Sequence, residues 1–138
     1  MNINYIEFYI EIGDKIDTLW NMFIAIHIAA FGFIFLSRRH KNFLTILFCL
    51  IGYGFFSYIN MNALVSSYEL LNYIIFDIKI MVESGIFNGD HKSISYLISK
   101  DYSNRRLTVL YIHIIAFIFI IYILFSGWRP KFIDRASG

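Results

Sequence analysis

The chain has 138 residues, of which 58% are hydrophobic and only 16% are charged, and its formal net charge is +2. Soluble domains are typically about 45–50% apolar and about 25% charged, so this composition excludes an ordinary soluble domain. The small net charge gives no support for a nucleic-acid partner, and a single proline is typical of a protein built from long helices.

The first 17 residues are acidic and are patterned for a helix. A signal peptide begins with basic residues instead, so we expect the chain to retain this segment. Its carboxylates form an outer acidic stripe at helical spacing, made of Glu7, Glu11, Asp14 and Asp17. The predicted first helix therefore starts near Tyr5, outside the membrane, and runs to Ser37.

Three long apolar runs without formal charge follow one another along the chain. Each has the roughly 20 residues that a helix needs to cross the hydrocarbon core, where only a helix satisfies the backbone of such a run. The predicted spans cover about residues 18–37, 42–64 and 106–128, and residues 65–105 form an outer segment. The predicted fold class is an all-α integral membrane protein with three transmembrane helices in a single membrane domain, 1–138.

Basic residues at the span ends predict the topology, because such residues stay on the cytoplasmic side. The determinants are Arg38, Arg39, Lys41, Arg129 and Lys131. They predict a multi-pass protein of the cell inner (plasma) membrane, with its N-terminus outside and its C-terminus in the cytoplasm. Arg105 and Arg106 oppose this orientation at an outer helix end, where Asp90 and Asp101 are near enough in sequence to offset them.

The outer segment is predicted to contain two helical stretches. Residues 69–83 have an apolar face and a polar face, so the second helix is expected to continue beyond the outer membrane surface and to pack on the outer part of the first. The alternative is a helix lying flat in the interface. A short helix is predicted near 93–100, and Ser103 is predicted to cap the third span.

Small and polar side chains mark one face of each of the first two spans. Small residues let helix backbones approach closely in lipid, and polar side chains hold helices together. The predicted packing or interface positions are Asn21, Ala25, Ala29, Gly32, Cys49, Gly52 and Asn60. Two uses are open for them, namely packing within the chain and contact between subunits.

Two histidines, His27 and His113, lie at similar depth within the spans. Intramembrane ionisable groups are functional candidates. A structural role is expected, with proton transfer as an alternative and haem ligation in a b-type haem subunit as a remote one, because no haem motif accompanies them. No span holds an Asp or Glu, and no catalytic motif occurs. We therefore expect no cofactor, no metal site and no enzymatic activity.

Two functional hypotheses follow from these features. In the first, the protein associates with itself into a helical assembly in the lipid bilayer, with ion conduction as a candidate property because the acidic stripe concentrates cations. In the second, it is an accessory subunit that braces a larger complex of other membrane subunits. Self-association is the preferred hypothesis.

Overall fold

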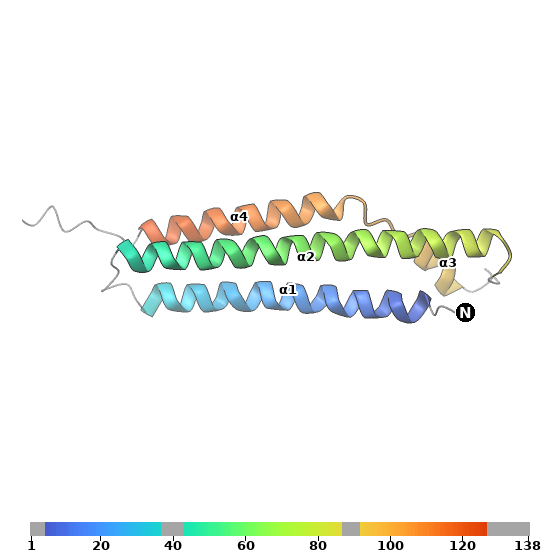
Figure 1. The fold of residues 1–138 in the computed structure, drawn as a ribbon, viewed down its shortest axis with the longest axis horizontal. Helices are drawn as coiled ribbons and strands as arrows, with labels where there is room; N and C mark the ends of the chain where they lie inside the picture. The colour runs from blue at the N-terminus through green and yellow to red at the C-terminus, as the bar shows by residue number, and fades with distance from the viewer. Residues whose placement is uncertain (1–4, 37–42, 87–91, 127–138) are drawn as a thin grey trace, which may run out of the picture.

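The computed structural model describes residues 5–36, 43–86 and 92–126. Within these ranges the chain is helical and forms no strand. Figure 1 shows the four helices in chain order, which are α1 (Tyr5–Leu36), α2 (Phe43–Glu83), α3 (Lys92–Ile98) and α4 (Arg105–Ser126). The short helix predicted near 93–100 corresponds to α3.

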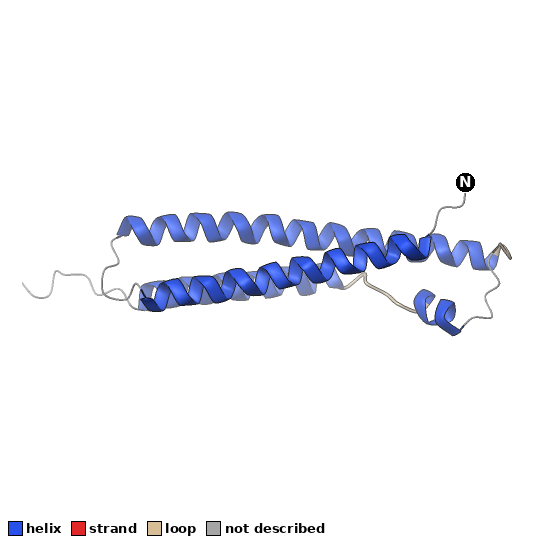
Figure 2. Ribbon diagram, turned by 90° about the horizontal axis from the view of Figure 1, so that it is seen from below, coloured by secondary structure: helices blue, strands red, loops and turns tan. Residues whose placement is uncertain are grey.

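The three long helices form an elongated bundle. Figures 1 and 2 show α1 and α4 running in one direction and α2 returning in the other. Helix α2 packs along both of its partners, whereas α1 and α4 share fewer contacts, and α3 lies against α2. Both α1 and α2 continue past the N-terminal end of α4.

Length and composition show that three of the helices could span a membrane. Helix α4 has 22 residues, which at 1.5 Å per residue extend about 33 Å, close to the roughly 30 Å of a hydrocarbon core. Helices α1, with 32 residues, and α2, with 41, are also apolar enough over a span-length window. Residues 69–83, whose pattern predicts a continuation of the second helix, belong to one uninterrupted α2.

The buried side chains gather into two clusters along the bundle. The first, here called the α3-side core, consists of Ile12, Ile16, Leu64, Leu71, Ile74, Ile78 and Val109. The second, here called the far core, consists of Ile34, Ile46, Tyr53, Ile120 and Leu124. Partly buried side chains of α3 also pack on the α3-side core, so the amphipathic end of α2 uses its apolar face within the chain.

Helix α2 ends in a turn that needs a glycine. Gly85 has a φ of 74°, a left-handed conformation that side chains disfavour. Its N–H donates to the carbonyl of Val82, at 3.1 Å, and the N–H of Ile86 donates to that of Met81, also at 3.1 Å. This paired arrangement is a Schellman C-cap, which satisfies carbonyls that the helix end leaves free.

The segment that leads into α4 is fixed to α2 by its backbone. The N–H of Tyr102 donates to Asn72 Oδ1 at 3.0 Å. Ser103, which is predicted to cap the third span, instead donates from its N–H and its hydroxyl to the Asp101 carboxylate, at 2.8 and 2.9 Å. Capping would require this hydroxyl to accept an N–H of the first turn of α4, whereas here it donates to Asp101.

Candidate functional site

The two histidines of the apolar spans, His27 and His113, lie about one helical turn apart in depth. Phe23 of α1 packs on His113 of α4, with ring centroids 4.4 Å apart, and Ile34 and Leu124 share the far core. Because α1 and α4 run in the same direction, a residue of α1 lies level with the residue about 90 positions later on α4. This level rule places His27 close to His113, as the sequence predicts.

Each histidine uses both ring nitrogens in hydrogen bonds within the chain. His27 Nδ1 donates to the Phe23 carbonyl at 2.6 Å, and the Tyr53 hydroxyl donates to His27 Nε2. His113 Nδ1 donates to the Val109 carbonyl at 2.9 Å, and the Asn60 amide donates to His113 Nε2 at 3.3 Å. A carbonyl only accepts, so each Nδ1 carries a proton.

This arrangement fits a structural role better than haem ligation. The Phe23 ring packs on both imidazoles, with centroid distances of 4.1 Å to His27 and 4.4 Å to His113. An axial ligand needs a free Nε2, and here each Nε2 already accepts a hydrogen bond from α2. In the described residues, no three His, Cys, Asp or Glu side chains are placed to hold a metal ion.

Asn60 leaves one hydrogen-bonding atom unused. Its side chain is 3% exposed, and its Oδ1 has no partner among the described residues. A buried acceptor without a partner costs free energy. The bond between Asn60 Nδ2 and His113 Nε2 is the contact that links this side chain to α4. Of the seven predicted packing positions, Asn60 is the one that the structure buries between helices of the same chain.

The small-residue face of α1 is exposed, and Ala29 lies at its edge beside α2. Its members, here called the α1 strip, are Asn21, Ala25, Ala29 and Gly32, and all four are exposed. The buried side chains of α1, such as Ile16 and Phe23, lie on the opposite side of the helix. Packing within the chain therefore does not use the strip.

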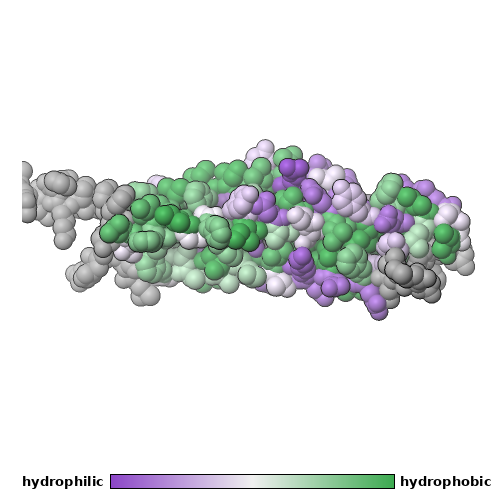
Figure 3. Space-filling view, viewed as in Figure 1, coloured by the Kyte–Doolittle hydropathy of each residue, from purple (hydrophilic) through white to green (hydrophobic). Residues whose placement is uncertain are grey.

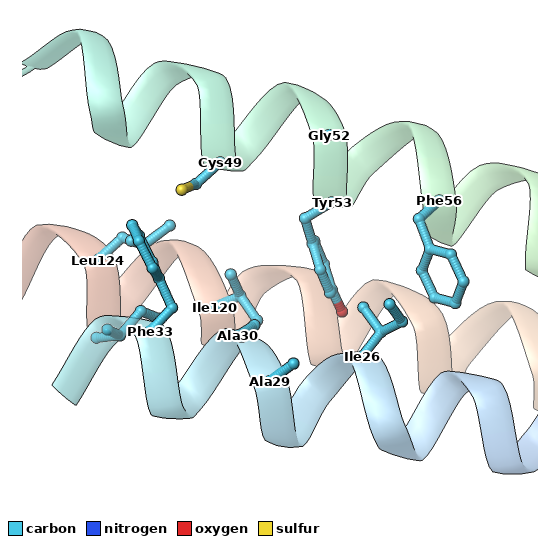
Figure 4. Close-up of a pocket in the computed structure, with 11 residues that line it drawn as sticks. Ile26, Ala29, Ala30, Phe33, Cys49, Gly52, Tyr53, Phe56, Ile120 and Leu124 are labelled. Atoms are coloured by element: carbon cyan, nitrogen blue, oxygen red, sulfur yellow. The ribbon is translucent and has the colours of Figure 1, made fainter. Parts of the chain in front are cut away.

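A hollow beside the strip lies among α1, α2 and α4 (Figure 4). Its volume is about 280 Å³, and Ala29, Gly52 and Cys49 are among its lining residues. A hypothetical Cβ on Gly52 meets no atom within 4 Å, so the glycine faces open space. The hollow is about twice the 150 Å³ of a cavity known to admit benzene, so it has room for bulky apolar groups.

Charged side chains of α1, α2 and α4 lie at similar levels of the bundle, and this zone is here called the charge belt. It consists of Asp14, Lys15, Asp17, Glu69, Arg105 and Arg106. Arg106 Nη1 lies 4.0 Å from Glu69 Oε1, and both side chains are at least half exposed. Between this belt and the far ends of the long helices, the described residues include no Asp, Glu, Lys or Arg. Figure 3 shows the hydrophilic residues gathered toward the α3 half of the visible face.

The remaining predicted site residues are placed as follows. Glu7, Glu11, Asp14 and Asp17, the outer acidic stripe, are all exposed. The sequence suggests that Asp90 and Asp101 neutralise the charge of Arg106, but in the structure Arg106 is paired with Glu69. Asp90 lies outside the described residues. The same holds for the topology determinants, which are Arg38, Arg39, Lys41, Arg129 and Lys131.

Aromatic contacts that sequence reasoning missed link α1 and α2 to the segment 99–104. Trp20 Nε1 donates to the Tyr68 hydroxyl at 3.1 Å, and Tyr68 stacks on Tyr102 with centroids 5.9 Å apart. The Tyr102 hydroxyl is in turn 3.1 Å from that of Tyr9. These residues are far apart in the sequence, so no local pattern could have revealed their contacts.

Comparisons with protein-family models, curated proteins and solved structures found no match.

Proposed function

We propose that the protein is a non-catalytic membrane protein that associates with itself through the α1 strip. The observation that carries the proposal is the exposure of Ala25, Ala29 and Gly32, which are small residues that the chain does not use for its own packing. Where lipid already solvates apolar side chains, close backbone approach is a main source of helix attraction. A small, exposed face is therefore suited to a second helix.

Substitution of the strip tests this function directly. Ala29→Leu adds bulk beside the hollow and should convert oligomers to monomers, whereas Ile28→Leu changes little volume and should leave them intact. Native mass spectrometry in mild detergent, repeated in lipid nanodiscs, reports the copy number of each variant. A wild-type protein that is monomeric in both media would falsify the proposal.

The proposed orientation places the charge belt at the outer membrane surface. Its support is the length of α4, which matches the hydrocarbon core from the belt onward. The excess lengths of α1 and α2 then extend beyond the outer face of the inner (plasma) membrane, with the N-terminus outside and the C-terminus in the cytoplasm. In intact cells of a Cys49→Ala variant, cysteine at Ser93 should react with an impermeant thiol reagent, and cysteine at Ser37 should not. The reverse labelling would contradict this orientation.

A bracing subunit is the second candidate function, favoured by exposed apolar residues on the outer part of α2. Tyr73, Phe76 and Ile80 are 67%, 60% and 47% exposed. Large apolar groups in water often mark contact with another protein. Purification in mild detergent distinguishes the two candidates, because a stoichiometric unlike chain favours bracing and identical copies favour self-association.

Ion conduction requires a path between copies under this proposal. The far core fills the bundle of one chain with apolar side chains such as Ile34, Ile46 and Leu124. A cation path would have to follow the acidic stripe and then Asn21 on the exposed side of α1. Flux of monovalent cations into vesicles that contain the protein tests this property separately from oligomeric state.

A further inference from the structure

We propose that the partner of the α1 strip is α4 of a neighbouring copy, packed parallel to α1. This inference rests on the proposed self-association and names the surface that covers the strip. Three observations select α4 over the other helices, namely charge, level and side-chain size.

Charge argues against pairing α1 with α1 of a second copy. The strip continues toward the N-terminus as the exposed carboxylates Glu11 and Asp14. Two such helices packed face to face would place carboxylates opposite carboxylates, which is unfavourable and reduces association. Helix α2 is little better, because its part beyond the membrane-length run carries Glu69, Asp77 and Glu83 against one lysine, Lys79.

Helix α4 has the opposite charge at the required level. It begins with Arg105 and Arg106 and contains no acidic residue. By the level rule, Asp17 of α1 lies close to the depth of Arg105. Copies inserted in the same orientation keep the same depths, so Asp17 of one copy lies at about the level of Arg105 of its neighbour. Arg105 is exposed, and Arg106 already contacts Glu69 of its own chain.

The exposed face of α4 carries large side chains at the levels where the α1 strip carries small ones. Ile115, Ile118 and Tyr122 are 66%, 60% and 67% exposed. The level rule places Ile115 at the depth of Ala25, and Tyr122 at the depth of Gly32. Bulky side chains of one copy therefore meet small side chains and the neighbouring hollow of the next, which permits close packing.

This contact is head-to-tail, because the strip and the α4 face are different surfaces of one chain. Such interfaces build closed rings or open filaments instead of two-fold dimers. It also buries the strip against α4, so the strip does not line a shared axis. The inference therefore predicts no cation flux along the strip.

Disulfide cross-linking in native membranes tests the contact. On a Cys49→Ala background, the pair Ala25→Cys and Ile115→Cys should give linked dimers and higher species on oxidation, because a disulfide needs Cα atoms about 4.4–6.8 Å apart. Ala25→Cys with Tyr122→Cys is the matched control. Its depths differ by seven residues, about 10 Å, so linking should be at least tenfold weaker.

A charge exchange tests the same contact without cysteines. Asp17→Lys alone should lower the association constant by up to about fivefold, the range of an exposed ion pair. Arg105→Asp added to Asp17→Lys should restore it. Analytical ultracentrifugation in detergent measures both, and circular dichroism checks that each variant is folded.

These experiments separate a failure of the α4 contact from a failure of self-association itself. Linked dimers from Ala25→Cys alone, without a higher ladder, would show α1 against α1 and overturn the α4 assignment. Oligomers in native mass spectrometry without any link between Ala25→Cys and Ile115→Cys would also overturn it while leaving self-association standing. Monomers that retain a lipid mass would overturn both and show that an acyl chain fills the hollow.

Discussion

At the α3 end of the bundle, hydrogen bonds join α1, α2 and the segment 99–104, whereas the far core consists of aliphatic side chains and Tyr53. The α3-side core is just as apolar, so composition alone does not separate the two. The two cores differ in their surroundings under the proposed orientation, because only the α3-side core extends into the part of the bundle that water surrounds. Burial of apolar surface drives association in water but not in lipid. Under the proposed orientation, the two apolar cores are therefore stabilised by different forces.

The largest expected effect compares two isoleucines. Ile74→Ala in the α3-side core removes both transfer free energy and packing, and should lower the free energy of unfolding by about 3 kcal/mol. Ile120→Ala in the far core should cost roughly 1–2 kcal/mol less, because lipid solvates the methyl groups equally well. The two side chains are matched, at 3% and 2% exposed. Reversible unfolding in mixed micelles measures both, and equal losses would show that the two cores share one environment.

A smaller effect is expected at the boundary between the two cores. Trp20→Phe removes the hydrogen bond to Tyr68 while keeping an aromatic ring, and should cost about 1 kcal/mol. Tyr68→Phe is the control, because it deletes the other partner of the same bond. No loss in Tyr68→Phe, which changes the packing least, would show that this bond does not stabilise the contact between α1 and α2.

Sequence patterns predict the long helices because their causes are local. Uninterrupted apolar runs and the 69–83 amphipathic pattern act over one or two turns, and α2 accordingly runs unbroken from Phe43 to Glu83. The partners of His27 and His113 depend on how helices rotate against each other. Tyr53 and Asn60 are about two turns apart on α2, and no spacing shows which histidine each will contact. The exposure of the α1 strip depends on the same rotation.

A still smaller effect is expected inside the membrane-length part of the bundle. A double-mutant cycle between Asn60→Leu and His113→Phe should give a coupling of about 0.6 kcal/mol, the typical value for polar contacts between membrane helices. The unused Asn60 Oδ1 favours a low value, because the asparagine is only half satisfied. A coupling above about 2 kcal/mol would exceed that precedent and indicate a larger polar network.

The smallest effect concerns the exposed turn before α4. The backbone N–H of Ser103, and then its hydroxyl, donate to Asp101 and lower the pKa of that carboxyl group. A lowered folded-state pKa contributes stability above the unfolded pKa, near 4, and this stability is lost as the pH falls through the folded-state value. The protection of the amides of 101–105 against hydrogen exchange should therefore fall only below about pH 4.

Ser103→Ala is the matched variant for this turn. It removes the hydroxyl and keeps the backbone donor, so the Asp101 pKa should rise toward its ordinary value without reaching it. Nuclear magnetic resonance titration of the side-chain carboxyl group measures the change. A carboxyl group that does not titrate in micelles would place the turn away from water and remove the contrast between the two ends.

The unbroken course of α2 has a mechanical consequence. Its 41 residues form a rod of about 61 Å without a proline or a break. Bilayer-spanning helices tilt when membrane thickness changes, and a tilt of about 10° about the midpoint displaces each end by roughly 5 Å. Because α3 and the segment 99–104 are attached to one end of this rod, they travel with it. Under the proposed orientation, a change in bilayer thickness is thereby converted into a displacement of the α3 end of the molecule.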